Sequence, residues 1–153
     1  MKSVLKSVMQ SVLGASVLAI CLTASTSHAA APKVSGTYGI TVYTECGSIP
    51  EGTAMGVGTM AFGNTPSSTA NVSIHFQWYD RRGNGTIKKD TRDMSGKLKL
   101  TATTFAIGDA PSGPMSFGGL DADGVAHTLN FLWTDFDPDF NLWCLHTLNA
   151  TRQ

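Results

Sequence analysis

Two histidines near the end of the chain, His127 and His146, are the side chains best suited to acid–base chemistry, because imidazole titrates near neutral pH. His127 has the same strand parity as Phe131 and Trp133, and we expect these three side chains on one face. No carboxylate near either histidine in the sequence completes a catalytic pair. We therefore assign no catalytic residue and interpret both histidines as core, rim or ligand-binding positions.

The segment from Asp135 to Asp139 places three carboxylates at alternate positions, as the first part of a calcium loop does. An EF-hand also needs glycine at its sixth position and a bidentate glutamate at its twelfth, and here those positions hold Phe140 and His146. The segment therefore predicts a tight turn between two strands. We expect no metal site and no cofactor.

The first 29 residues have the order of a secretory signal peptide. Lys2 and Lys6 precede an apolar stretch, which is followed by small and polar residues. Small residues at Ser27 and Ala29 predict cleavage after Ala29, so that a single domain spans residues 30–153. The pattern predicts an exported bacterial protein that is periplasmic or extracellular.

Three cysteines are present, and the predicted leader contains one of them. Cys21 lies in a sequence similar to a lipidation box, but the bulky Ile20 precedes it, so we expect no lipid anchor. Cys46 and Cys144 remain, and neither lies in a CxxC motif. Two cysteines in an exported chain predict one structural disulfide rather than a catalytic thiol.

Composition excludes several classes of protein. The chain has 153 residues, of which 42% are hydrophobic and 14% charged, with eleven basic and eleven acidic side chains. Such a balance excludes a disordered tail, a coiled coil and a strongly basic nucleic-acid binder. After residue 30 no apolar run reaches the roughly 18 residues of a transmembrane helix. One basic region, residues 81–99, could contact an anionic envelope surface, although lysines on strands commonly serve only solubility.

Short segments rich in Thr, Val, Phe and Trp alternate with Gly, Asn, Asp and Pro from Ser35 onward, which predicts an all-β domain. Eight strands are expected: Gly36 to Cys46, Gly52 to Gly63, Thr69 to Asp80, Thr86 to Met94, Lys97 to Ile107, Pro114 to Leu120, Val125 to Asp135 and Asn141 to Ala150. In the third strand apolar residues alternate with polar ones, which predicts that His75 is a solvated surface residue. A change of phase between Leu100 and Phe105 predicts a bulge or bend.

Eight consecutive antiparallel strands predict either an up-and-down β-barrel or a β-sandwich. Closure into a barrel removes both exposed sheet edges. A disulfide between Cys46, at the end of the first strand, and Cys144, in the last, would join the two ends of the sheet. This favours the barrel over the sandwich.

The opening Ser35-Gly36-Thr37-Tyr38, a cysteine that ends the first strand, a glycine-rich second strand and a terminal strand at the C-terminus together resemble small exported bacterial calycin-like barrels, in the broad lipocalin-like or allene-oxide-cyclase-like sense. The matching lipocalin triplet carries tryptophan where this chain has Tyr38. The resemblance implies a barrel that holds a small ligand.

Three functions are therefore expected, in this order. The first is a non-catalytic barrel that binds a small apolar or aromatic ligand through Trp133, Phe131, His127, Trp78 and His146. The second is a structural or interaction protein of the cell envelope that uses residues 81–99. The third is a cofactor-free isomerase or cyclase, in which His146 or Glu45 would supply the acid or base.

Overall fold

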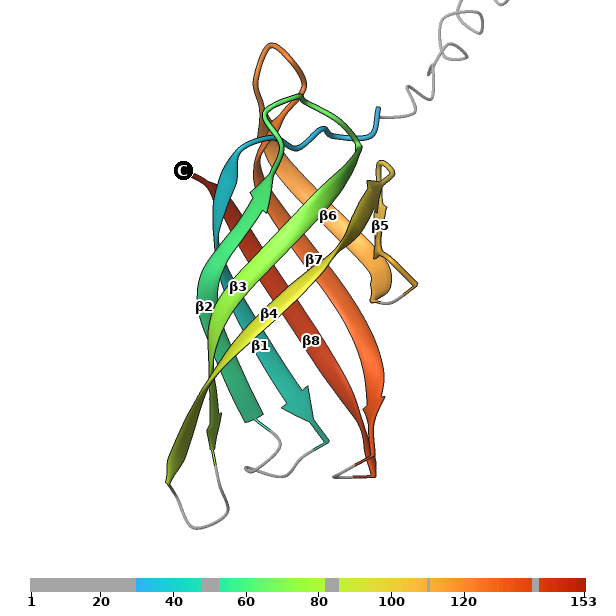
Figure 1. Ribbon diagram of the computed structural model, residues 1–153. Helices are drawn as coiled ribbons and strands as arrows, with labels where there is room; N and C mark the ends of the chain where they lie inside the picture. Colours follow the sequence, from blue (N-terminus) through green and yellow to red (C-terminus); the bar gives the residue numbers. More distant parts are fainter. Residues whose placement is uncertain (1–29, 48–52, 82–85, 110, 139–140) are drawn as a thin grey trace, which may run out of the picture.

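The structure is a computed structural model that describes residues 30–47, 53–81, 86–109, 111–138 and 141–153. These residues contain no helix and form eight strands (Figure 1). The strands are β1 (Thr37–Cys46), β2 (Thr53–Phe62), β3 (Thr69–Arg81), β4 (Ile87–Leu100), β5 (Thr104–Ile107), β6 (Ser112–Leu120), β7 (Ala126–Asp137) and β8 (Leu142–Arg152). The predicted leader lies outside the described residues, and in the part that is described no helix is long and apolar enough to cross a membrane.

The strands form one closed antiparallel barrel in which each strand pairs with its neighbours in sequence and β8 returns to pair with β1. The barrel prediction is therefore confirmed, and the sandwich alternative is wrong. Closure is possible because one face of most strands is apolar, so that the sheet can curl around a single core. The predicted disulfide is also confirmed, since Cys46 and Cys144 are paired opposite each other across β1 and β8 and are bonded.

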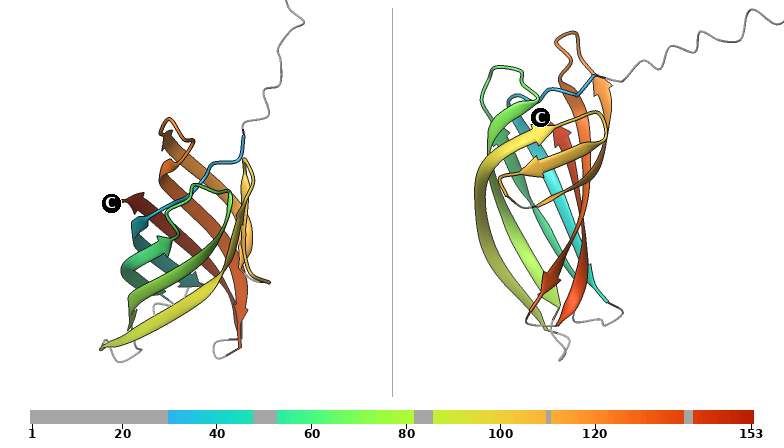
Figure 2. Two further views of the ribbon diagram at one scale, coloured as in Figure 1. Left: turned by 45° about the horizontal axis from the view of Figure 1, so that its top comes forward. Right: turned by 90° about the vertical axis from the view of Figure 1, so that its right-hand side faces the viewer.

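The N-terminal segment 30–36 crosses one end of the barrel before β1 begins (Figures 1 and 2). Its backbone bonds to two loops: the amide of Lys33 donates to the carbonyl of Gly124, and the amide of Val34 donates to the carbonyl of Ser67. Val34 is fully buried. We call this the sealed end of the barrel, and the opposite end, at Cys46 and Cys144, the disulfide end.

Polar contacts fix the sealed end as well. The hydroxyl of Tyr38, which is fully buried, donates to the carbonyl of Ala126 at 2.7 Å, and burial raises the pKa of this phenol. In the predicted turn from Asp121 to Gly124, the Asp121 carboxylate accepts the amide of Val125 at 2.9 Å and the guanidinium of Arg152 at 2.7 Å. These hydrogen bonds, that of the Val125 amide most of all, hold the pKa of Asp121 below its usual value of 3.8.

The fourth and fifth predicted strands were wrongly divided. The sequence predicted a break at Ser95-Gly96, but β4 runs through it to Leu100, where the chain turns into the four-residue β5. Gly96 is a packing position, because an added Cβ would lie 3.0 Å from a methyl of Ile107. The turn follows from Thr101, whose hydroxyl accepts the amide of Thr104 at 2.9 Å, in agreement with the predicted bend.

A shortened β5 leaves part of the barrel wall without a partner strand. It pairs with β4 only from Leu98 to Leu100, and β6 pairs with β7 only from Phe131 toward the sealed end. Among the described residues, positions 87–96 of β4 therefore pair only with β3, and positions 132–137 of β7 pair only with β8, while the carbonyl of Lys97 accepts the amide of Gly108. We call the stretch of wall between these two edges the seam; the right-hand view of Figure 2 shows β4 and β7 continuing beyond β5 and β6.

Candidate functional site

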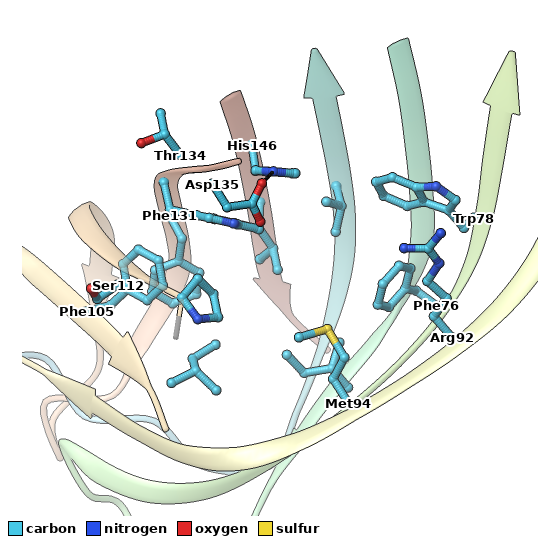
Figure 3. A pocket seen from close by; sticks show the side chains of 16 residues that line it. Phe76, Trp78, Arg92, Met94, Phe105, Ser112, Phe131, Thr134, Asp135 and His146 are labelled. Atoms are coloured by element: carbon cyan, nitrogen blue, oxygen red, sulfur yellow. Dashed lines mark hydrogen bonds and ion pairs between the residues drawn. The ribbon is translucent and has the colours of Figure 1, made fainter. Parts of the chain in front are cut away.

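A cavity of about 460 Å³ lies inside the barrel beside the seam. Most of its lining is apolar or aromatic and comes from strands on both sides of the seam (Figure 3). The lining residues are Val42, Ile74, Phe76, Trp78, Arg92, Met94, Phe105, Ile107, Pro111, Ser112, Phe131, Trp133, Thr134, Asp135, His146 and Leu148. Because Arg92, Met94, Thr134 and Asp135 are also exposed, the cavity reaches the surface at the seam.

Two groups of aromatic rings form opposite walls of the cavity. On β3, Phe76 and Trp78 meet edge to face with ring centroids 5.7 Å apart. On the other wall Phe105 of β5 lies 4.5 Å from Phe131 and 6.2 Å from Trp133, both on β7. Such rings provide a large apolar contact area at little cost in conformational entropy, which suits the binding of a flat apolar molecule.

Glycine in the second strand makes the β3 wall possible. An added Cβ at Gly56 would lie 2.9 Å from the Phe76 ring and 3.0 Å from the Trp78 ring. An added Cβ at Gly58 would collide with the backbone of His75 and Phe76. The missing side chains of β2 thus leave room for the two rings of β3, which stand at the side of the cavity rather than filling it.

A chain of hydrogen bonds runs through the imidazole of His146 at the disulfide end. Its Nδ1 lies 2.7 Å from the hydroxyl of Thr44, and its Nε2 lies 2.7 Å from a carboxylate oxygen of Asp135. Because a carboxylate only accepts hydrogen bonds, the Nε2 carries a proton, and in the neutral imidazole Nδ1 accepts the hydroxyl of Thr44. The ring also stacks on Trp133, with centroids 4.9 Å apart and planes 9° from parallel.

This chain has the hydroxyl, imidazole and carboxylate of a nucleophilic triad, but its hydroxyl belongs to a residue outside the cavity lining. Thr44 is buried and is not among the residues that line the cavity, so its hydroxyl does not face a bound molecule. Both nitrogens of His146 are occupied by protein groups. The arrangement therefore holds the imidazole as a fixed polar part of the wall.

Arg92 supplies the positive charge of the cavity. Its guanidinium lies over the ring of Trp78, 5.0 Å from the centroid, in a cation–π contact. Figure 3 places Arg92 beside Phe76 and Trp78, across the cavity from Asp135 and His146. The cavity thus combines apolar walls with a cation on one side and a histidine–carboxylate pair on the other.

The structure brings together four of the five residues predicted to bind a ligand. Trp133, Phe131, Trp78 and His146 line the cavity. His127 does not, because its side chain is exposed while its neighbour Ala126 is fully buried. His127 is therefore not part of the cavity wall that contains Phe131. Gly119, at a φ of 61°, would place an added Cβ 3.2 Å from the Cβ of His127, and the register of β6 and β7 is the same on both sides of these two residues.

Other residues singled out in the sequence lie away from the cavity. Glu45 is exposed on β1 and is not among the lining residues. His75 is exposed, as predicted, and lies 2.6 Å from a carboxylate oxygen of Asp93. In the basic region Lys89 lies over the ring of Tyr79, whereas Lys88 has the parity of the cavity residue Arg92, so these two lysines belong to opposite faces of β4.

Sequence reasoning missed the pairing of His146 with Asp135. The two residues are eleven positions apart and meet across the β7–β8 hairpin, where Trp133 pairs with His146 and Asp135 pairs with Cys144. Counting the strand register outward from the predicted turn would have revealed the neighbours. Asp135, His146 and the Cys144 sulfur also lie within 4.8 Å of one another, but that sulfur is bonded to Cys46, so only two donors remain for a metal ion.

No family model, curated protein sequence or solved structure matches this chain. The eight-stranded closed antiparallel barrel is consistent with a calycin-like fold. The assignment of a function consequently depends on the cavity itself.

Proposed function

We propose that the protein binds a small molecule with an apolar, aromatic-sized body inside its barrel. The observation that carries this proposal is the cavity of about 460 Å³ with five aromatic rings in its walls. Its volume lies within the range of about 300 to 1,000 Å³ that is usual for small-molecule sites. The interior of an eight-stranded barrel can be filled completely by its own side chains or can hold one small ligand. A completely filled interior would have no cavity of this volume.

The placement of the tryptophans supports the proposal and provides its readout. Trp78 and Trp133 line the cavity, whereas Trp143 is 67% exposed and contacts Phe136 on the outside of the barrel. A ligand in the cavity would contact the first two rings and leave the third in water. Binding should therefore change part of the tryptophan emission.

The test is a fluorescence titration with N-phenyl-1-naphthylamine, a neutral apolar probe. The wild-type protein should increase the probe emission and lose tryptophan emission by energy transfer. Trp133→Ala removes one side of the cavity wall and should weaken binding about tenfold or more, because a buried aromatic contact is lost. Trp143→Ala is the matched control and should bind the probe as the wild type does.

Equal effects of the two substitutions would place the probe on the outer surface and contradict the proposal. Absence of binding to the folded wild type would contradict it as well. Circular dichroism before the titration establishes that each variant is folded.

A further inference from the structure

We propose that the ligand carries an anionic group and that Arg92 binds this group at the seam. The inference rests on the proposed function, and it names the chemical class of the molecule: an apolar or aromatic body with one oxyanion such as a carboxylate or sulfonate. It follows from the position of Arg92, from its partners and from the charges that surround it.

Arg92 lies at the edge of the cavity, on the part of β4 that pairs with β3 but not with β5. It is paired with Phe76 of β3, and its guanidinium lies over the ring of Trp78, also on β3. The guanidinium forms no ion pair and no hydrogen bond with any residue that the structure describes. The cation–π contact uses none of the N–H groups as hydrogen-bond donors to protein, so these groups can bind two oxygens of one anion.

The acidic groups that the structure describes near the seam form no ion pair with Arg92. Asp90, two positions earlier on the same side of β4, accepts the amide of Thr91 with its Oδ1 at 2.9 Å. Asp135, on the opposite wall, is bound to His146 at 2.7 Å. Met94 is the next residue of β4 on the cavity side. Arg92 is thus the one Arg or Lys side chain among the lining residues of the cavity, and it has no protein anion as a partner among the described residues.

The shape of the cavity determines how such a molecule would lie. The aromatic walls extend into the barrel, whereas Arg92 is exposed at the seam. An apolar body would therefore insert between the rings, and the oxyanion would stay at the surface, where it keeps part of its hydration. This orientation avoids burial of a charge in the apolar core.

Two fluorescent probes with one ring system separate this inference from the proposed function. 8-Anilino-1-naphthalenesulfonate carries a sulfonate, and N-phenyl-1-naphthylamine does not. Arg92→Gln should weaken binding of the sulfonate probe about tenfold more than it weakens binding of the neutral probe, because only the sulfonate loses a charge-assisted hydrogen bond. Arg92→Lys, which keeps the charge but loses the planar fork, should give an intermediate loss.

Lys97→Gln is the matched control, because Lys97 is an exposed residue of the same strand with the opposite parity. It removes the same unit of charge outside the cavity and should leave the affinity for both probes unchanged. If Lys97→Gln weakens the sulfonate probe as much as Arg92→Gln does, the net charge of the protein determines binding and the inference is wrong. Unchanged sulfonate affinity in Arg92→Gln would also overturn it, while binding of the neutral probe would leave the proposed function intact. If neither probe binds the wild type, the proposed function itself fails.

Discussion

The sealed end and the disulfide end of this barrel are built from the same eight strands but differ in what completes them. At the sealed end the segment 30–36 bridges two loops, and Val34, Tyr38 and Leu129 are fully buried. Toward the disulfide end β4 no longer pairs with β5, and β7 no longer pairs with β6. Met94, which lines the cavity there, is 43% exposed. We infer that the sealed end supplies most of the packing energy and that the other half can therefore keep an unfilled interior.

Loss of the disulfide should have the largest effect on stability. The bond closes a separation of 98 residues and holds β1 to β8 at the end of the barrel that lacks the strap of residues 30–36. Loop-closure entropy predicts that Cys46→Ser with Cys144→Ser lowers the free energy of unfolding by about 4 to 5 kcal/mol, as an upper value. Urea unfolding of the variant and of the wild type, with and without reductant, measures the difference. A loss below about 1 kcal/mol would mean that strand pairing alone holds the disulfide end.

Equal truncations in the two halves should differ in cost. Leu129→Ala leaves a cavity in the packed half and should lower the free energy of unfolding by about 2 to 5 kcal/mol. Met94→Ala removes a half-exposed side chain from a wall that already faces empty space, so its cost should be less than about 1 kcal/mol. Chemical denaturation of both variants tests the comparison. Similar costs for the two would contradict the division of the barrel into a packed and an unfilled half.

Acid should weaken the sealed end by a smaller amount. The amide of Val125 and the guanidinium of Arg152 lower the pKa of Asp121 in the folded protein, so the carboxylate stabilises the fold above its unfolded pKa. This contribution is lost as the pH falls through the lower, folded pKa. Below pH ~4 the urea midpoint of the wild type should therefore fall more steeply than that of Asp121→Asn, which has no charge to lose there. Parallel curves for the two proteins would exclude Asp121 as a source of acid sensitivity.

The sequence predicted the features that depend on local pattern and missed those that depend on pairing. The alternation of apolar and polar residues in the third strand and the turn residues around Asp121 were enough to locate a strand and a turn. Both signals are local, because the side-chain period and the turn residues can be read without knowing which strands pair. Ser95-Gly96 resembles a turn in isolation, but Gly96 is needed for close contact with Ile107, which is near only in the folded barrel. The seam exists because β5 and β6 pair with β4 and β7 over only part of their length. The extent of this pairing cannot be predicted from a local sequence pattern.

In the candidate site too, the sequence predicted residues that lie on apolar strand faces but missed contacts between strands. Trp133, Phe131 and Trp78 were expected from their positions in apolar strand faces, and they line the cavity. The partner of His146 and the contact of Arg92 with Trp78 were not expected, because each contact joins two strands and depends on the register between them. His127 was misplaced, because side-chain parity does not show how far along the strand the cavity extends, and His127 lies exposed near the start of β7.

Both ends of the described chain lie at the sealed end. The backbone of Lys33 is bonded to Gly124, the amide of Gln153 donates to the carbonyl of Thr37, and Figure 1 shows the C-terminus and residues 30–36 on the same side of the barrel. The cavity and the seam lie in the half of the barrel toward the disulfide end. A tether, a tag or a fusion partner attached directly at residue 30 or at Gln153 would therefore start at the end of the barrel opposite the disulfide. Molecules immobilised in this way on a surface would all point the seam half away from it, which gives the protein a defined polarity for sensing or delivery.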